Sequence, residues 1–230
     1  NATGAYAVGE DGRMYKKTDA ASATERWKHV KSDLVNTIHS VRFFNEQSGA
    51  ALVELQPGEK YLMRTFDGGQ TWVQISDDPF NHLSISNNRS HILAVGNDGK
   101  IEVVIPGNTL VTVPVASGLT SDLTAGWLDN QVDGNGNSNP HIIVVTTSGK
   151  VRYTSNGFAI YPSWETTDYT ALIGSDNITD IRAERGWTSN QIIYGAALTQ
   201  AGKLYRVDKQ AGVNVVDLFD FTGAGTGHAG

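Results

Sequence analysis

The segment Thr65–Trp72, with the sequence TFDGGQTW, concentrates more chemically capable side chains than any other stretch of this chain. It combines a carboxylate (Asp67), two hydroxyls (Thr65 and Thr71), two glycines and an indole within eight positions. Asp67 could act as a catalytic acid, as a metal ligand, or as an acceptor for backbone N–H groups of its own turn, as Asx turns do. Because the glycines permit a tight backbone, we predict a structural turn whose tryptophan covers the joint between two sheets.

Arg42 and Arg182 are a second candidate, because they occupy the same position in two similar segments, IHSVRFF and ITDIRAE. If both segments are innermost strands around one axis, the two guanidinium groups can face a common channel and bind an anion, since their paired N–H donors match a carboxylate. The alternative is that each arginine forms a structural ion pair with a neighbouring carboxylate, such as Asp180 or Glu184. Of the two interpretations, the ion pair is the simpler expectation.

These arginines do not complete a glycosidase site. The equivalent positions in two looser copies of the strand hold Ser84 and Trp127, so a third arginine is missing there. Retaining glycosidases also need two carboxyl groups about 5 Å apart, and the sequence identifies no such pair. We therefore predict that the protein is not an enzyme and that none of its residues is catalytic.

The segment DNQVDGNGNSN is a candidate calcium loop. Asp129, Asp133, Asn135 and Asn137 offer oxygen ligands, and the intervening glycines would let the loop close around an ion. The glutamate that completes an EF-hand loop is replaced by Val144. A plain insertion without metal is the favoured alternative, so we expect no required cofactor.

The elements that must position these residues are repeated along the chain. A strand, a polar turn ending in glycine and a second strand recur as a unit, as in AVGEDGRMY and AVGNDGKIE. Glycine suits this turn because two-residue hairpins of the Asp-Gly type require a positive φ. The turns end at Gly12, Gly58, Gly99, Gly149 and Gly202, which are 41 to 53 residues apart.

A second strand motif precedes four of these turns, and a third follows them, often opened by a tryptophan such as Trp27, Trp72 or Trp164. Each repeat therefore contains four short strands and no helical periodicity. Four strands in a repeat of about 40–50 residues are typical of a propeller blade. We predict an all-β fold, a β-propeller of five four-stranded antiparallel blades forming a single domain over residues 1–230.

The first repeat lacks its innermost strand, which residues 221–230 could supply to close the ring, although their sequence is a poor strand by propensity. The alternatives are a larger ring or a β-sandwich pair, and either of them would need residues in addition to 1–230.

The composition and net charge exclude several classes of partner and of binding site. The net charge is −6, from 18 basic and 24 acidic residues, which argues against non-specific binding to nucleic acid. The chain has no cysteine, so disulfides and thiolate metal sites are excluded. No stretch approaches the roughly 18 apolar residues that a membrane-spanning helix needs. These totals do not predict an oligomeric state.

TFDGGQTW resembles the Asp-box of the bacterial neuraminidase repeat (BNR) family, whose pattern is Ser/Thr-x-Asp-x-Gly-x-Thr-Trp. TSNG, at Thr154–Gly157, resembles a degenerate copy with asparagine for aspartate. The resemblance implies a β-propeller in which such boxes lie at the rim, away from the ligand face. The matching residues are Thr65, Asp67, Gly69, Thr71 and Trp72.

We therefore predict a non-enzymatic binding or structural propeller. Analogy at the level of the fold favours an extracellular, cell-surface or virion attachment module that binds a protein or a glycan, since propellers of the BNR kind are frequent in exported bacterial proteins and phage virions. The alternatives are a sialidase-like glycoside hydrolase and an assembly factor that docks on a larger complex. We expect two sets of loops to form the ligand face. One set joins blades, at Asp77–Asn81, Ser117–Asp122 and Glu165–Asn177, and the other links second to third strands, at Glu10–Gly12, Gln56–Glu59 and Asn97–Gly99.

Overall fold

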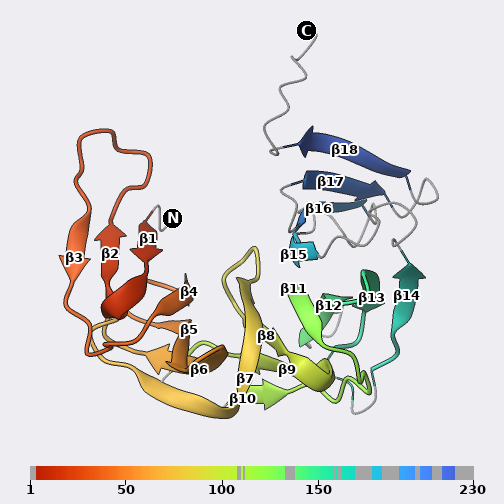
Figure 1. Ribbon diagram of the computed structural model, residues 1–230, viewed down its shortest axis with the longest axis horizontal. Coiled ribbons are helices and arrows are strands. Elements are labelled where there is room, and N and C mark those ends of the chain that lie inside the picture. Colours follow the sequence, from red (N-terminus) through yellow and green to blue (C-terminus); the bar gives the residue numbers. More distant parts are fainter. Residues whose placement is uncertain are drawn as a thin grey trace, which may run out of the picture.

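The computed structural model describes residues 4–107, 110, 112–132, 138–157, 159, 162–168, 178–182, 192–199, 203–208 and 214–220. Within these residues, hydrogen bonding defines four sheets whose strands are all antiparallel. The sheets follow one another along an arc around a common centre, with the first and last sheets at its two ends (Figure 1). No helix in the described part of the chain is long and apolar enough to cross a membrane.

The strands follow the predicted repeat. The first sheet contains β1 (Ala5–Val8), β2 (Met14–Lys17) and β3 (Lys28–Val30). The second contains β4 (Ile38–Phe43), β5 (Gly49–Gln56), β6 (Glu59–Thr65), β7 (Val73–Ile85), β8 (Ile92–Gly96), β9 (Ile101–Val104) and β10 (Thr112–Pro114). The third contains β11 (Leu123–Val132), β12 (Ser138–Thr146), β13 (Lys150–Thr154) and β14 (Glu165–Asp168). The fourth contains β15 (Ile178–Asp180), β16 (Ile192–Thr199), β17 (Lys203–Asp208) and β18 (Asn214–Asp220).

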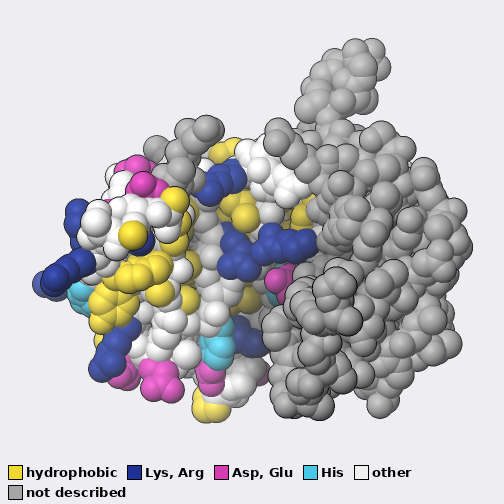
Figure 2. All heavy atoms as spheres, turned by 90° about the horizontal axis from the view of Figure 1, so that it is seen from above, with side chains coloured by type: hydrophobic (Ala, Val, Ile, Leu, Met, Phe, Trp, Pro, Cys, Tyr) yellow, Lys and Arg dark blue, Asp and Glu magenta, His cyan; other side chains and the backbone are white. Residues whose placement is uncertain are grey.

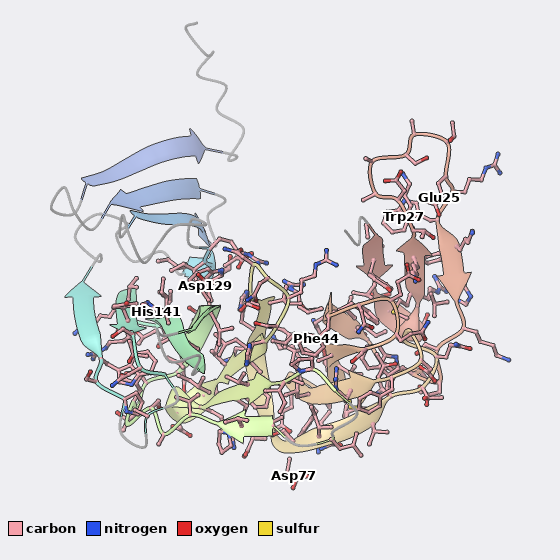
Figure 3. All side chains as sticks on the ribbon, turned by 180° about the vertical axis from the view of Figure 1, so that it is seen from behind. Glu25, Trp27, Phe44, Asp77, Asp129 and His141 are labelled. Atoms are coloured by element: carbon pink, nitrogen blue, oxygen red, sulfur yellow. The ribbon has the colours of Figure 1, made fainter. Side chains whose placement is uncertain are left out.

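The second sheet consists of two four-stranded units that share β7. The first half of this strand pairs with β6, and its second half, Phe80–Ile85, pairs with β8. The prediction of a loop at Asp77–Asn81 is therefore wrong, because the chain stays extended as it passes from the outer edge of one unit to the inner edge of the next. Asp77 lies at the outer margin of the molecule (Figure 3). The prediction of a loop at Glu165–Asn177 is wrong in its first part, since β14 occupies Glu165–Asp168.

The Asp-Gly turns form as predicted. Between β1 and β2, η1 (Glu10–Gly12) has Asp11 at φ 56° and Gly12 at φ 65°. Between β8 and β9, η2 (Asn97–Gly99) has Asp98 at φ 52° and Gly99 at φ 70°. A Cβ at Gly12 would lie 1.9 Å from the Leu34 carbonyl oxygen, so both the backbone angle and the close approach require glycine. Gly58 and Gly149 also have positive φ, whereas Gly202 lies outside the described residues.

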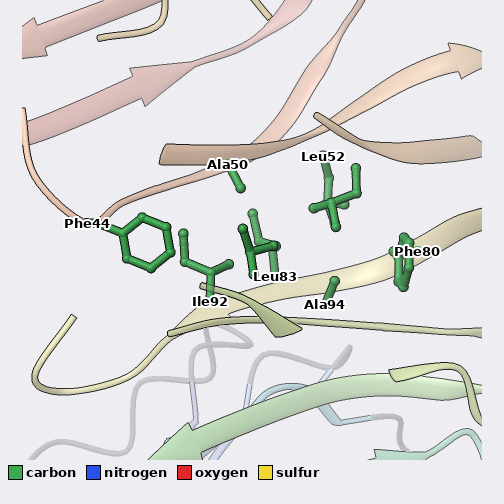
Figure 4. Close-up of a cluster of buried hydrophobic side chains, with 9 residues drawn as sticks. Phe44, Ala50, Leu52, Phe80, Leu83, Ile92 and Ala94 are labelled. Atoms are coloured by element: carbon green, nitrogen blue, oxygen red, sulfur yellow. The ribbon is translucent and has the colours of Figure 1, made fainter. Parts of the chain in front are cut away.

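The core lies between the units, not within one of them. Successive side chains of β5 point to opposite faces: Ala50 and Leu52 pack toward β7 and β8, while Ala51 and Val53 pack toward the first sheet. Because both faces are buried, the segment GAALV is apolar throughout and does not alternate. The cluster between the two halves of the second sheet, shown in Figure 4, comprises Phe44, Ala50, Leu52, Leu62, Phe80, Leu83, Ile92, Ala94 and Val104.

This architecture is that of an all-β propeller, and it positions β4, the second half of β7, β11 and β15 as the innermost strands of their units. Within the described residues, the first sheet has three strands where the third and fourth have four, in agreement with a first repeat that lacks its innermost strand. The blade number of five and the closure of the ring stay predictions.

Candidate functional site

The segment Thr65–Trp72 forms the hairpin that connects β6 to β7, and its polar groups are bonded to one another. The Asp67 carboxylate accepts hydrogen bonds from the backbone N–H groups of Gln70 and Thr71, each at 2.9 Å, and from the Thr71 hydroxyl at 2.6 Å. The Thr65 hydroxyl donates to Asp67 at 2.9 Å and accepts from the Gly69 N–H at 2.9 Å. Burial alone would raise the pKa of Asp67, but the hydrogen bonds from Thr71, Thr65 and Gln70 hold it below its ordinary value.

Trp72 connects this hairpin to the first sheet. The indole is buried, its Nε1–H donates to the Gly69 carbonyl at 2.9 Å, and its ring packs in a cluster with Met14 of β2 and Phe43 of β4. The backbone N–H of Asp33 donates to the Gln70 carbonyl at 2.9 Å. Asp67 is thus committed to its own turn and Trp72 to the joint between sheets, which gives this hairpin the structural geometry predicted for it.

Thr154–Gly157, which begins at the last residue of β13, repeats the contacts between Thr65 and Asp67 with asparagine in place of aspartate. The Thr154 hydroxyl donates to the Asn156 side-chain oxygen at 2.6 Å, and the Asn156 N–H donates to the Thr154 hydroxyl at 3.3 Å. The Ser163 N–H donates to the same asparagine oxygen at 3.2 Å. The second carboxylate oxygen of Asp67 accepts the bond from the Thr71 hydroxyl, and an asparagine has no equivalent oxygen.

Arg42 lies on β4 and Arg182 just after β15, 140 positions later in the chain; their convergence on one anion channel stays a prediction. Burial lowers the pKa of Arg42, and the positive charge of Arg182 lowers it further, while Asp180 acts in the opposite direction. Arg42 donates from Nη1 to the Val41 carbonyl at 2.8 Å, but its Nε is buried without a hydrogen-bond partner. The buried Nε of Arg42 therefore demands an acceptor that the described residues do not supply.

Asp180 does not meet that demand, because it is held by other groups. Its carboxylate lies 3.1 Å from Nε2 of His82 on β7, accepts from the Ile181 N–H at 2.8 Å, and lies 3.8 Å from Nε of Arg182. The Gly126 N–H donates to Nδ1 of His82, which leaves the other ring nitrogen, Nε2, facing Asp180. Burial would raise the pKa of Asp180, but the His82 bond and the Arg182 charge keep it low.

The structural ion pair expected for Arg182 with Asp180 is thus present only at a long distance, and Glu184 lies outside the described residues. Ser84 and Trp127 are fully buried at the other two positions, where sequence comparison finds no third arginine. Figure 2 looks onto the side of the arc between its two ends and shows Lys and Arg side chains gathered in the middle of that face.

The calcium candidate is only partly within the described residues. Asp129 lies on β11, paired with His141 of β12 (Figure 3), and not in a loop as the sequence suggests. Three more strand residues follow it, which carry the chain about 10 Å further at ~3.3 Å per residue. Asp133, Asn135 and Asn137 lie outside the described residues. Within the described residues, no group of three His, Cys, Asp or Glu side chains is placed to hold a metal ion.

Sequence reasoning missed Arg64, the residue before the Asp-box. Its side chain is fully buried and donates to the Gly49 carbonyl, to the Ser48 hydroxyl and, across the joint to the next unit, to the Gly107 carbonyl at 3.0 Å. Burial lowers the pKa of Arg64 to about 10. No local pattern announces this role, because the acceptor at Gly107 is 43 positions away.

Comparison with solved structures places the chain among β-propellers. It matches YCF48 bound to a D1 peptide with a TM-score of 0.56 and 17% identity, over 89% of this chain and 60% of that one. It matches Chaetomium thermophilum Sqt1 bound to the N-terminus of ribosomal protein L10 with a TM-score of 0.56 and 12% identity, over 94% and 58%. An ancestral GH74 enzyme matches with a TM-score of 0.54 and 14% identity, over 95% and 30%.

These similarities concern the fold alone. The chain spans only about 60% of the length of YCF48 and of Sqt1. No protein-family model matches the chain, and no curated protein matches it. Membership of the BNR family therefore stays a prediction that rests on the Asp-box residues.

Proposed function

We propose that this protein is a non-enzymatic binding propeller whose innermost strands hold an acidic segment of a partner protein, with Arg42 and Arg182 as its anchors. The observation that carries the proposal is the buried Nε of Arg42, which has no acceptor and lies in the field of a second guanidinium. A carboxylate supplies both the acceptors and the charge that this pair needs. Two structural neighbours, YCF48 and Sqt1, are themselves bound to a peptide or a protein terminus.

The hydrogen bonds of Asp180 favour a binding site over a catalytic site. Asp180 is the carboxylate whose charge acts on Arg42. It is already hydrogen-bonded to His82 and to the Ile181 N–H. A glycosidase would need a free acid and a second carboxylate about 5 Å away. We accordingly expect no hydrolysis of sialyl or aryl glycosides.

A selection from a displayed library of random ten-residue peptides tests the proposal. Peptides rich in Asp and Glu, or bound through a free C-terminal carboxylate, should be enriched at low salt. Replacing either arginine, as in Arg42→Gln or Arg182→Gln, should weaken their binding about tenfold to a hundredfold, as loss of a charged hydrogen bond does. The exposed Arg26→Gln is the matched control and should leave binding unchanged.

Two outcomes would overturn the proposal. One is enrichment of peptides without acidic groups. The other is acidic peptides whose binding is the same in the wild type and in the Arg42→Gln, Arg182→Gln double variant.

Several finer points remain part of the proposal. An attachment role on a virion or cell surface, and a glycan partner, rest on analogy at the level of the fold. A role in assembly of a larger complex is the competing form of the same binding function. Fractionation of the source cells, with identification of the protein that co-purifies, separates these forms. Calcium binding by Asp133, Asn135 and Asn137 is tested by titrating the metal-free protein with calcium chloride.

A further inference from the structure

The joint between the first and second sheets is built like the joint between the second and third sheets. In each, an Asp-Gly turn packs against the linker that leads into the next inner strand, β4 or β11. Gly12 donates its N–H to the Asn36 carbonyl at 2.9 Å, and Gly99 donates its N–H to the Ser121 carbonyl at the same distance. The two linkers therefore correspond position by position, and their side chains can be compared directly.

The side chains at these two joints differ in polarity. Counted from the shared hydrogen bond, Val35 of the first joint corresponds to Thr120 of the second. On the adjoining hairpins, Leu55 corresponds to Ser148, because the residue before each donates its N–H to the linker at 3.0 Å. The first joint thus has apolar side chains at two positions where the second joint has hydroxyls, and Val35 is 80% exposed.

These apolar side chains line an open hollow of about 270 Å³ where the first sheet meets the second (Figure 1). The hairpin between β5 and β6 forms one wall, since the two strands stay paired as far as Gln56 and Glu59. A single exposed apolar side chain is ordinary on a protein surface, but Val35, Leu55 and Pro57 line one hollow together. Its volume is several times the ~30 Å³ of one water molecule, so a side chain of a partner fits there.

The two charged residues that line the hollow, Asp11 and Glu54, are both acidic. The Glu54 carboxylate accepts from the Gly58 N–H at 3.0 Å and lies 2.6 Å from Nε2 of His39, and these bonds hold the pKa of Glu54 below its ordinary value. Glu54 is thus committed to its own hairpin. Asp11 lies 3.5 Å from Arg13, but the two side chains are 75% and 66% exposed. Because such a surface ion pair contributes little, a cation of a partner can take the place of Arg13.

We infer that this hollow binds a basic segment of a partner protein, whose apolar side chain packs on Val35 and Leu55 while a neighbouring Lys or Arg pairs with Asp11. The apolar contact supplies affinity, and the carboxylate selects the charge of the occupant. The hollow is separate from the arginines of the proposed function. Strand β4 begins at Ile38, directly after the linker, and Arg42 lies four residues further along it, which is about 13 Å in an extended strand.

The charges favour a basic partner over other occupants of the hollow. The chain has a net charge of −6, so a second copy would approach against electrostatic repulsion. An acidic segment, which the proposed function assigns to Arg42 and Arg182, would meet the carboxylates of Asp11 and Glu54 here. The two sites therefore select partners, or parts of one partner, of opposite charge.

The experiment screens the full chain against a displayed library of random ten-residue peptides. Peptides that combine an aliphatic or aromatic residue with Lys or Arg should be enriched, as a pool separate from the acidic peptides. Val35→Ser should weaken their binding about tenfold through the lost apolar contact. Asp11→Asn should weaken it about threefold and reduce its dependence on salt. Val73→Ser is the matched control, because Val73 is a 47% exposed valine at the start of β7, and it should leave binding within about twofold.

The inference is overturned if the selection enriches acidic peptides alone, or if basic peptides bind the Val35→Ser and Asp11→Asn variants as tightly as the wild type. Loss of basic-peptide binding in the Arg42→Gln, Arg182→Gln double variant would also overturn it, because the peptides would then bind at the arginines. NMR shifts of the Val35 and Asn36 amides that grow with protein concentration without peptide would identify a second copy as the occupant instead. Since the proposed function is tested on acidic peptides, either proposal can fail alone.

Discussion

The Asp-box hairpin and the arginine pair are both polar clusters at joints between sheets, and they differ in how completely their hydrogen bonds are met. In the hairpin, every polar group of Asp67 and Thr65 has a partner within the turn. At Arg42, Nε is buried without a partner, and the charge of Arg182 lowers the pKa of Arg42. A satisfied cluster stabilises the fold, whereas an unsatisfied one costs stability that a ligand can recover.

Replacing the tryptophan that docks the hairpin should have the largest effect on stability. Trp72→Ala empties a buried position against Met14 and Phe43, and we expect a loss of about 3–5 kcal/mol in the free energy of unfolding. Trp27→Ala is the control, because Trp27 opens β3 in the same way but is 49% exposed, and should cost about 1 kcal/mol or less. Urea denaturation at matched m-values measures both, and equal losses would contradict the assignment of Trp72 to the joint.

Removing the carboxylate of the hairpin should have the next largest effect. Asp67→Ala leaves the Gln70 and Thr71 N–H groups without their acceptor, which costs about 1–3 kcal/mol. Binding of the acidic peptides should stay unchanged, because the turn is not part of the proposed binding site at Arg42 and Arg182. If the variant keeps its urea midpoint but loses peptide binding, the hairpin belongs to the binding site and the comparison above is wrong.

The same carboxylate should make a pH-dependent contribution that asparagine cannot. Because the pKa of Asp67 is lower in the folded state than in the unfolded one, its stabilisation is present above the unfolded pKa of about 3.9 and is lost as pH falls through the folded pKa. Asp67→Asn keeps one acceptor oxygen, as Asn156 does, and should lose less stability than Asp67→Ala. The difference from wild type should shrink as acid titrates the wild-type carboxylate, and a difference that is constant from pH 7 to pH 2 would exclude this role.

Replacing the buried arginine should affect stability in the opposite direction. Arg42→Leu removes a guanidinium with an unbonded Nε and a like-charged neighbour, so the free energy of unfolding should stay the same or rise by up to about 1 kcal/mol. The same variant should lose binding of acidic peptides. Thermal and urea unfolding provide the measurement, and a loss greater than about 1 kcal/mol would instead give Arg42 a structural role like that of Asp67.

Gln70 should have the smallest effect, although it stands inside the hairpin. Its side chain is exposed and donates to the Asp67 carbonyl at 2.9 Å, a bond that water can replace. Gln70→Ala should therefore change the free energy of unfolding by no more than about 0.5 kcal/mol. A cost equal to that of Asp67→Ala would mean that the side-chain amide, and not the carboxylate alone, maintains the turn.

Local features of the chain were predictable because a few neighbouring residues encode them. The Asp-Gly turns depend on two backbone angles, and the Asp-box depends on oxygens and N–H groups within eight positions. The repeat of these local signals was sufficient for the propeller class and for the missing inner strand of the first sheet. The matching positions of Arg42 and Arg182 in the sequence also follow from the repeat, and their meeting at the centre stays a prediction.

Only the tertiary structure decided features that join distant parts of the chain. The path of β7 from one unit into the next follows from its pairing with β6 in the first half and with β8 in the second, so the polar stretch around Asp77 was mistaken for a loop. The bond between His82 and Asp180 spans 98 positions, and the role of Arg64 depends on an acceptor in another unit. Sequence determined which turns and strands form, because these depend on local sterics and hydrogen bonds. Packing between units decides which polar groups at the centre stay without a hydrogen-bond partner. The binding function is proposed for those groups.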